Sequence, residues 1–305
     1  MMELRWVHHK TNERRNLAMV DLRATELYSQ YSHQEINRRQ FLEKLAIVVG
    51  GVAAAYALLP LLENSVAQAE TIAAGDARLA TQTVKFATGA GQMTGYQAQP
   101  KNITKMPAIL VVHENRGLNP HIEDVTRRFA LEGFLALAPD ALSSMGGSPV
   151  DPEQAVGMIQ KLDMGETVKN FTAAAAYLKT HPQSTGKVGV VGFCWGGAVA
   201  NSLAVQSTDI IAAVPYYGKQ PPTEDVAKIK AALLLHYAGL DERINQGIPA
   251  LKEALVKNGV EHELYMYEGT AHAFNNDTNP ARYNKQAAEL AWQRTIEFLT
   301  RKLKS

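Results

Sequence analysis

The chain has 305 residues, of which 46% are hydrophobic and 20% are charged, and its formal net charge is +1. This composition is ordinary for a globular protein, and the length is enough for one large α/β domain. Residues 70–305 carry 23 basic and 23 acidic side chains, without a cluster of Lys and Arg interleaved with aromatic residues. Such a balance offers no electrostatic footprint for a phosphate backbone, so a nucleic-acid partner is not expected.

Residues 1–69 are predicted to be an N-terminal leader. Asn37-Arg38-Arg39-Gln40-Phe41 precedes an apolar run over residues 46–62, and Ala67-Gln68-Ala69 then supplies a small-x-small site that a signal peptidase could cut. This order resembles a twin-arginine export signal and predicts a periplasmic or otherwise exported protein. The run of 17 residues is short for a bilayer core, which needs about 20, so a cleaved signal is favoured over an uncleaved membrane anchor. An amphipathic helix with solvated arginines is the other interpretation.

The export machinery and the membrane are expected partners through this leader only. One cysteine excludes an internal disulfide, so the domain over residues 70–305 is expected to depend on its core alone for stability. In that domain, apolar runs alternate with segments of helical periodicity, which is typical of a mainly parallel sheet flanked by helices. The predicted strands are 82–88, 92–99, 108–112, 134–139, 188–191, 210–216, 232–237 and 263–267. Helices are expected from Pro120, around 168–178, over 245–256, and at the C-terminus around Trp292.

The strand at 188–191 runs into Gly192-Phe193-Cys194-Trp195-Gly196-Gly197. A strand that ends in Gly-x-nucleophile-x-Gly and opens a helix is typical of a nucleophile elbow, in which the glycines relieve crowding at a sharp turn. The turn exposes the nucleophile at the carboxyl edge of the sheet, beside a helix N-terminus whose dipole favours a thiolate. Cys194 is therefore the candidate nucleophile; the alternative is a small buried hydrophobe, the usual state of a lone cysteine.

A catalytic triad in such a fold takes its acid and then its base from later loops. Asp241 and His272 each follow a predicted strand by a few residues, so both are expected at the same sheet edge as Cys194. The alternatives are a turn-forming or helix-capping aspartate and an ordinary loop histidine, and Asp140 is a rival acid. The backbone N–H of Trp195 is expected to bind the oxyanion, with a second donor near Glu114 or Asn115.

The elbow, the Asp241 and His272 segments, and His113-Glu114-Asn115-Arg116-Gly117-Leu118-Asn119 together resemble the dienelactone hydrolase (carboxymethylenebutenolidase) family of the α/β-hydrolase superfamily, over residues 82–302. The resemblance implies an α/β-hydrolase fold and attack by Cys194 on small esters or lactones through an acyl thioester. It also implies that Glu114 contacts Cys194 and helps to remove its proton, with Arg116 as a competing partner. A simple surface salt bridge is the other interpretation of Glu114.

Family members that act on dienelactone hold its carboxylate with arginines, one of them shortly after the triad histidine. Here no arginine follows His272 before Arg282, so other activated esters or lactones are favoured as substrates. Arg116, Tyr217 and Phe274 are expected to contact the substrate. Residues 218–230, where many α/β-hydrolases insert a lid, are too few for one and predict an open cleft roofed by Trp195 and Tyr217.

No cofactor or metal is expected, because His113, Glu114 and His121 do not have a recognised ligand spacing. Two other functions stay open. One is a catalytically weak protein that kept the fold and uses the cleft for ligand binding or interaction. The other is a hydrolase of different acyl esters or of thioesters.

Overall fold

The computed structural model describes Ala24, Leu27 and residues 36–52, 54–56, 71–89 and 91–304. The chain divides into two compact units. The larger consists of Glu70–Asn275 and Asn284–Ser305, and the smaller of Met1–Ala69 and Asn276–Tyr283.

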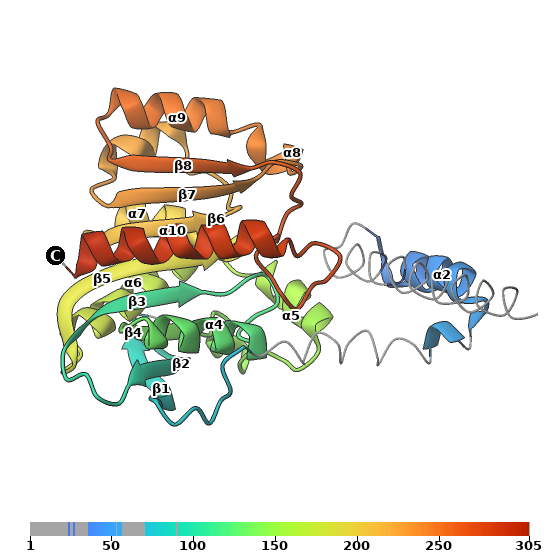
Figure 1. The fold of residues 1–305 in the computed structure, drawn as a ribbon, viewed down its shortest axis with the longest axis horizontal. Helices are drawn as coiled ribbons and strands as arrows, with labels where there is room; N and C mark the ends of the chain where they lie inside the picture. Colours follow the sequence, from blue (N-terminus) through green and yellow to red (C-terminus); the bar gives the residue numbers. More distant parts are fainter. Residues whose placement is uncertain are drawn as a thin grey trace, which may run out of the picture. The chain divides into compact units, whose positions relative to one another are not determined.

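An 8-stranded sheet in the order β1-β2-β4-β3-β5-β6-β7-β8 forms the centre of the larger unit. Its strands are β1 (Leu79–Thr88), β2 (Gly91–Pro100), β3 (Met106–Val112), β4 (Leu135–Pro139), β5 (Ser184–Phe193), β6 (Ile210–Tyr216), β7 (Ala232–Ala238) and β8 (His262–Tyr267). The β1–β2 and β2–β4 pairs are antiparallel, and every pair from β4 to β8 is parallel. The predicted mainly parallel sheet is confirmed. Its parallel strands end at one edge, toward which their arrowheads point in Figure 1.

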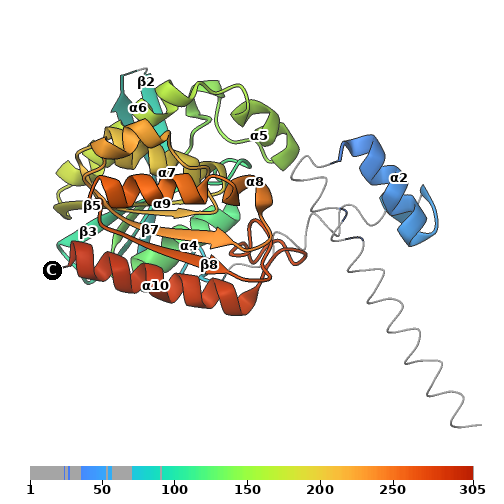
Figure 2. The same ribbon diagram turned by 90° about the horizontal axis from the view of Figure 1, so that it is seen from above.

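Helices cover both faces of this sheet, as Figures 1 and 2 show together. The helices of the larger unit are α4 (Pro120–Leu131), α5 (Pro152–Ile159), α6 (Met164–Thr180), α7 (Trp195–Gln206), α8 (Glu242–Asn245), α9 (Ile248–Lys257) and α10 (Lys285–Leu303). Alternate residues of the central strands point to opposite faces and divide the core in two. Leu110 and Val190 pack with α6, α7 and α9, whereas Val111 and Val191 pack with α4 and α10. Strands buried on both faces are the reason for the unbroken apolar runs in the sequence.

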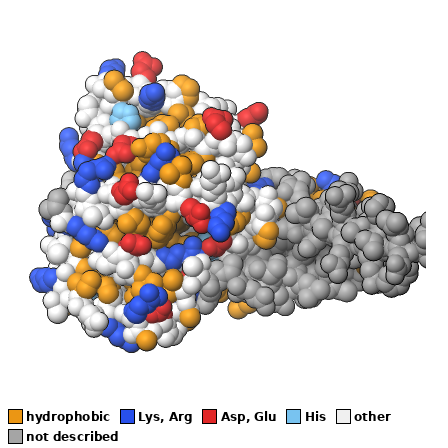
Figure 3. All heavy atoms as spheres, viewed as in Figure 1, with side chains coloured by type: hydrophobic (Ala, Val, Ile, Leu, Met, Phe, Trp, Pro, Cys, Tyr) orange, Lys and Arg blue, Asp and Glu red, His pale blue; other side chains and the backbone are white. Residues whose placement is uncertain are grey.

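Two features of the larger unit were not predicted from the sequence. The connection between β4 and α6 contains a 3-10 turn, η1 (Ser143–Met145), and the helix α5. The expected helix over 245–256 is instead two helices, α8 and α9, because the chain turns at Gly247 before α9 begins at Ile248, with Pro249 in its first turn. On the face drawn in Figure 3, Lys and Arg side chains lie interspersed with Asp and Glu, without a gathering of one sign.

In the smaller unit, α2 (Arg38–Val49) contains the paired arginines in its first turn. The side chains of Asn37 and Gln40 each accept the other's backbone N–H, which forms a capping box. Among the described residues, no helix is both long enough and apolar enough to cross a membrane. The expected cleavage site, Ala67-Gln68-Ala69, lies outside the described residues.

Candidate active site

Cys194 lies between the end of β5 and the first turn of α7, in a strained backbone conformation. Its φ is 56° and its ψ is −114°, and its N–H donates to the carbonyl of Tyr216 on the neighbouring strand β6 at 3.0 Å. Among the described residues, the only other non-glycine residues with positive φ are Tyr217 (38°) and Ala273 (68°). The three flank one another at the same sheet edge, after β5, β6 and β8. Such conformations cost about 1–3 kcal/mol each, and they typically concentrate at functional sites.

Gly196 allows the start of α7 to pack directly on the end of β3. A Cβ at this position would lie 2.4 Å from the carbonyl oxygens of both Val112 and His113. These neighbours are backbone atoms that cannot turn aside. The second glycine of the Gly-x-Cys-x-Gly sequence is therefore required because the two backbones approach each other closely here. It allows the Cys194 turn to pack against the loop that follows β3.

Asp241 and His272 contact each other as the sequence predicted. Asp241 begins α8, but its side chain caps no helix N–H; Oδ2 lies 2.5 Å from Nδ1 of His272. Both side chains are largely buried, at 6% and 10% exposed. Burial alone would lower the pKa of His272, but the charge of Cys194 and hydrogen bonds with Asp241 and Cys194 raise it to about 10. The carboxylate, imidazole and thiol therefore form one connected chain.

The rival acid Asp140 does not reach His272. Its carboxylate accepts the backbone N–H of Leu142 at 2.9 Å, and from Ser148 it accepts the N–H at 2.6 Å and the hydroxyl at 2.7 Å. These bonds hold the turn that follows β4. The same Ser148 hydroxyl oxygen accepts the N–H of Leu118 at 2.8 Å, so it links this turn to the loop after β3.

Tyr217 and Glu114 lie beside this chain. The ring of Tyr217 is 4.9 Å from that of His272, and its hydroxyl lies 3.5 Å from Oε1 of Glu114. Both residues are buried. Burial and the nearby charges of Glu114 and Cys194 raise the pKa of Tyr217 well above its ordinary value. The phenol therefore keeps its proton and can act as a donor between two acidic groups.

His113 fixes the loop that contains Glu114. It is fully buried, its Nδ1 lies 2.6 Å from the carbonyl oxygen of Glu114, and its Nε2 accepts the N–H of Ala141 at 3.1 Å. Its ring stacks on that of Trp195 at 5.4 Å, with 18° between the planes. Among the described residues, neither the N–H of Trp195 nor that of Asn115 finds an acceptor in the protein.

The model of the dienelactone hydrolase family matches residues 93–303 of the sequence. The chain belongs to this family. Over 246 residues it is 34% identical to a "Putative carboxymethylenebutenolidase" of Saccharolobus solfataricus, with 69% of this chain and 94% of that protein covered. It is also 32% identical over 222 residues to a protein of the same name from Escherichia coli O157:H7, covering 68% and 81%.

Among solved structures, the chain is similar to the "Putative Dienelactone Hydrolase" of Klebsiella pneumoniae, with a TM-score of 0.67 and 26% identity over 73% of this chain and 98% of that one. An acylaminoacyl peptidase of Pyrococcus horikoshii, at 16% identity and a TM-score of 0.57, shares the fold alone. These matches confirm the predicted α/β-hydrolase fold and the predicted enzyme class, a carboxylic-ester hydrolase.

In this dienelactone hydrolase family member, Arg116 does not pair with Glu114 as the sequence suggested. Among the described residues, its Nε and Nη2 have no hydrogen-bond partner although the side chain is 8% exposed. Its charge instead acts on Glu153 in α5: burial raises the pKa of Glu153, and Arg116 opposes that rise. The unpredicted helix α5 places this carboxylate within electrostatic range of the guanidinium, and among the described residues no hydrogen bond joins the two.

The expected roof and substrate contacts are also arranged differently. Tyr217, predicted to roof the cleft with Trp195, is 1% exposed and forms no roof, and Phe274, predicted to contact the substrate, is 0% exposed. The ring of Phe274 packs against that of Tyr217, with 5.6 Å between the ring centroids, and so helps to hold Tyr217 in place. The half-buried Trp195 packs instead against an apolar cluster that includes Leu142 and Ala155. The connection that contains α5 therefore borders the site.

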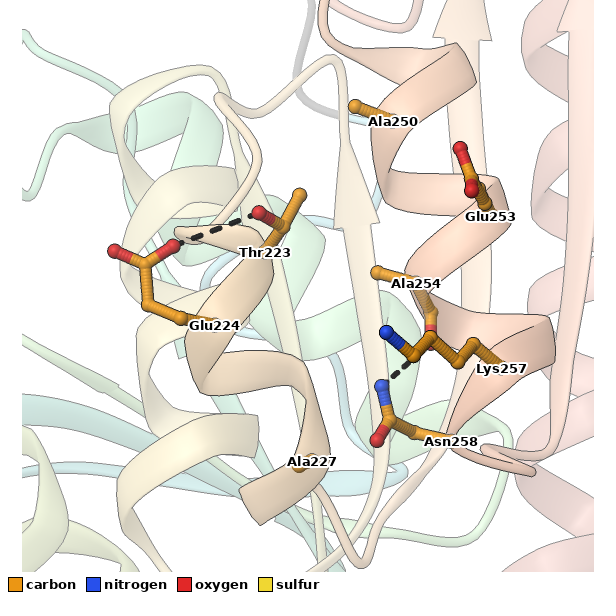
Figure 4. Close-up of a pocket in the computed structure, with 8 residues that line it drawn as sticks. All are labelled: Thr223, Glu224, Ala227, Ala250, Glu253, Ala254, Lys257 and Asn258. Carbon is orange, nitrogen blue, oxygen red and sulfur yellow. Dashed lines mark hydrogen bonds between the residues drawn. The ribbon is translucent and has the colours of Figure 1, made fainter.

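A separate groove of about 460 Å³ lies between the 3-10 turn η2 (Thr223–Lys228) and α9 (Figure 4). Its lining residues are Thr223, Glu224, Ala227, Ala250, Glu253, Ala254, Lys257 and Asn258. None belongs to the Cys194 site. Among the described residues, no group of three His, Cys, Asp or Glu side chains could hold a metal ion.

Proposed function

We propose that the chain hydrolyses small activated esters or lactones with Cys194 as nucleophile, His272 as acid and base, and Asp241 as the group that orients His272. The observation that carries this proposal is the connected chain of carboxylate, imidazole and thiol, with Asp241 Oδ2 2.5 Å from His272 Nδ1. Its members come from three separate loops at one sheet edge. A structural role would not require such convergence on a strained cysteine.

The first half-reaction forms an acyl thioester. The raised pKa of His272 favours its imidazolium form. The proposed reaction starts from this cation and the Cys194 thiolate. The thiolate sulfur attacks the ester carbonyl carbon, and the resulting oxyanion accepts hydrogen bonds from the N–H groups of Trp195 and Asn115. When the carbon–oxygen bond breaks, the imidazolium gives its proton to the leaving oxygen. An alcohol or enol departs, and the acyl group stays on sulfur.

The second half-reaction consumes water. Neutral His272, held by Asp241, takes a proton from a water molecule whose oxygen attacks the thioester carbon. The carbon–sulfur bond breaks, the carboxylic acid leaves, and the thiolate and imidazolium return to their starting state. A thiolate leaves tetrahedral adducts readily, so stabilised leaving groups such as enolates suit this site better than amines.

Glu114 and Tyr217 are proposed to prepare the nucleophile. Glu114 is buried beside the Tyr217 hydroxyl at 3.5 Å, and the charges of Glu114 and Cys194 both act on that phenol. A carboxylate in this position can assist the removal of the Cys194 proton, which ends on His272, while the phenol donates a hydrogen bond. Arg116, whose buried Nε and Nη2 have no partner among the described residues, is proposed to bind a polar group of the substrate.

The test is a direct search for the acyl thioester. The protein contains one cysteine, so any thioester must form at Cys194. We expect a burst of p-nitrophenol from p-nitrophenyl acetate, a mass increase of one acetyl group after acid quenching, and loss of both in Cys194→Ala. A panel of enol lactones, alkyl esters and thioesters then ranks the substrates.

The outcome that contradicts the proposal is equal turnover by the wild type and Cys194→Ala. Ligand binding that persists in both proteins would favour a binding function for the cleft. Ser202→Ala is the matched control, because this α7 hydroxyl donates to the Ala198 carbonyl of its own helix at 3.0 Å. It should leave the burst unchanged.

We also propose export through the N-terminal leader and a periplasmic location. The paired arginines are exposed in the first turn of α2, where Arg39 contacts Glu43 at 2.9 Å. Replacing both Arg38 and Arg39 with Lys keeps the charge but removes the guanidinium groups. We expect the double variant to accumulate inside the cell, measured by fractionation. Unchanged delivery to the cell envelope would contradict the proposal.

A further inference from the structure

The N–H groups of Trp195 and Asn115 are proposed to form the oxyanion hole, and His113 contacts Trp195 and the Glu114–Asn115 peptide. Its ring stacks on Trp195 at 5.4 Å, and its Nδ1 lies 2.6 Å from the carbonyl oxygen of Glu114. That oxygen belongs to the peptide unit that joins Glu114 to Asn115. In a trans peptide, the C=O and the N–H point in opposite directions within one plane. A group that holds the Glu114 carbonyl therefore also aims the N–H of Asn115.

The partners of His113 determine which ring nitrogen carries the proton. The N–H of Ala141 is a donor and lies 3.1 Å from Nε2, so Nε2 must accept. The hydrogen of a neutral ring is then on Nδ1, where it is donated to the Glu114 carbonyl. Burial, opposed by the backbone bond and the charges of Asp140 and Glu114, lowers the pKa of His113. The ring therefore stays neutral and keeps this tautomer.

We propose that His113 is a positioning residue that sets the oxyanion hole, by orienting the Glu114–Asn115 peptide and by fixing the plane of Trp195. It does not touch the substrate. The inference rests on the proposed function, because it assigns the aim of an N–H group that the proposed reaction uses. The Ala141 N–H that holds the ring lies in the turn after β4, so His113 couples the position of this turn to that of the loop after β3.

Two substitutions separate the two hydrogen bonds. His113→Asn places an amide N–H near the position of Nδ1 and can still donate to Glu114. His113→Gln places an amide oxygen near the position of Nε2 and can accept from Ala141, but it leaves the Glu114 carbonyl without its donor. We expect kcat for p-nitrophenyl acetate to fall about 10- to 100-fold in His113→Gln and far less in His113→Asn, with KM little changed.

Alkylation of Cys194 by iodoacetamide supplies a readout that needs no oxyanion hole, because that displacement forms no oxyanion. We expect its rate to stay within about threefold of wild type in both variants, since the catalytic thiol keeps its partners. His181→Gln and His181→Asn are matched controls, because His181 lies before β5 at the opposite sheet edge and contacts Tyr177. Equal loss of kcat in the two His113 variants, or a parallel loss of alkylation, would overturn the inference.

A structural readout keeps this test independent of the proposed function. In crystal structures of the variants, the Glu114–Asn115 peptide should rotate in His113→Gln and keep its orientation in His113→Asn. An unrotated peptide in His113→Gln overturns the inference whatever the protein hydrolyses. Should the Gln variant fail to fold, ¹⁵N-histidine NMR of the wild type decides: a proton on Nε2 of His113 at neutral pH overturns it. Absence of ester turnover in the wild type would instead contradict the proposed function.

Discussion

The two sides of the candidate site are held in place by different means. The Cys194 turn is fixed by backbone atoms: its N–H donates to the Tyr216 carbonyl at 3.0 Å, and Gly196 lets α7 approach the end of β3 without a side chain between them. The facing loop after β3 is fixed by side chains. His113 and Ser148 connect it to the turn after β4 through bonds of 3.1 Å to Ala141 and 2.8 Å from Leu118.

This difference predicts how each side should respond to substitution. Backbone contacts at van der Waals limits tolerate no added atom, so the Cys194 turn should fail abruptly on substitution. Side-chain hydrogen bonds contribute about 1 kcal/mol each, so the facing loop should lose its geometry in steps. Substitutions on the two sides can break or sharpen this comparison.

The largest expected effect comes from Asp241→Asn. This substitution changes the Asp241–His272 pair, which lies next to Cys194. The uncharged amide can donate its N–H to Nδ1, which favours the wrong tautomer of His272, and it no longer stabilises the imidazolium, so kcat should fall about 10³-fold or more. The pKa of His272, now raised to about 10 in part by Asp241, should fall as well. Steady-state kinetics and NMR titration measure both. Asp209→Asn, at an exposed ion pair with Lys179, is the control.

Gly196→Ala tests the backbone-fixed side. Its Cβ would lie 2.4 Å from the carbonyl oxygens of Val112 and His113, so the free energy of unfolding should fall by about 3 kcal/mol or more. Urea unfolding measures this loss. In Gly157→Ala, where nothing lies within 4 Å on α5, a gain of about 0.5–1 kcal/mol is expected. Similar stability of the two variants would contradict the view that close backbone approach holds the Cys194 turn.

The same contrast explains what the sequence could predict. Backbone constraints restrict which residue types a position can hold, so the glycines around Cys194 indicated a sharp turn after a strand. Buried parallel strands appeared as apolar runs such as 108–112. The placement of Asp241 and His272 followed from strand order, because parallel strands end at one edge. Each of these predictions depended on a local pattern or on the fold.

Hydrogen bonds between side chains that are distant in the sequence could not be predicted in this way. His113 was considered only as a metal ligand, and Asp140 only as a rival acid, because nothing in their local sequence indicates partners 28 and 8 residues away. Helix α5 was missed in a connection whose apolar residues pack on Trp195, and with it the electrostatic interaction of Glu153 with Arg116. Phe274 was predicted to contact the substrate, and the structure shows it fully buried. The sequence does not distinguish an apolar residue that lines a cleft from one that packs beneath it.

The buried histidine His236, on β7, allows a test of how stability depends on pH. His236 accepts the N–H of Tyr217 at its carbonyl, 2.7 Å away, and its ring contacts Tyr267 and Thr295. Burial, aided by the charge of Arg294, lowers its pKa to about 3. In the unfolded chain the pKa returns to about 6.5, so the unfolded state binds the proton first as pH falls.

The stability contributed by neutral His236 is therefore complete above about pH 6.5 and is lost as pH falls toward 3, reaching a loss of about 2 kcal/mol at pH 5. His272 acts in the opposite sense, since its raised pKa adds stability below about pH 6.5 that is lost toward pH 10. Unfolding of wild type and His236→Gln at pH 7 and pH 5 isolates the first effect. An unchanged pH dependence in His236→Gln would assign the acid sensitivity to other groups.

The smallest expected effect belongs to Ser148→Ala, on the side-chain-fixed loop. Its hydroxyl donates to Asp140 Oδ1 at 2.7 Å and accepts the N–H of Leu118 at 2.8 Å, so its removal leaves a buried donor and a carboxylate oxygen each without one partner. We expect about 1–2 kcal/mol less stability in urea unfolding. Because Gly117, at φ 74°, packs against this hydroxyl, the loop should also loosen and lower kcat several-fold. A collapse as abrupt as that of Gly196→Ala would mean that both sides depend on backbone packing, whereas a graded loss would separate them.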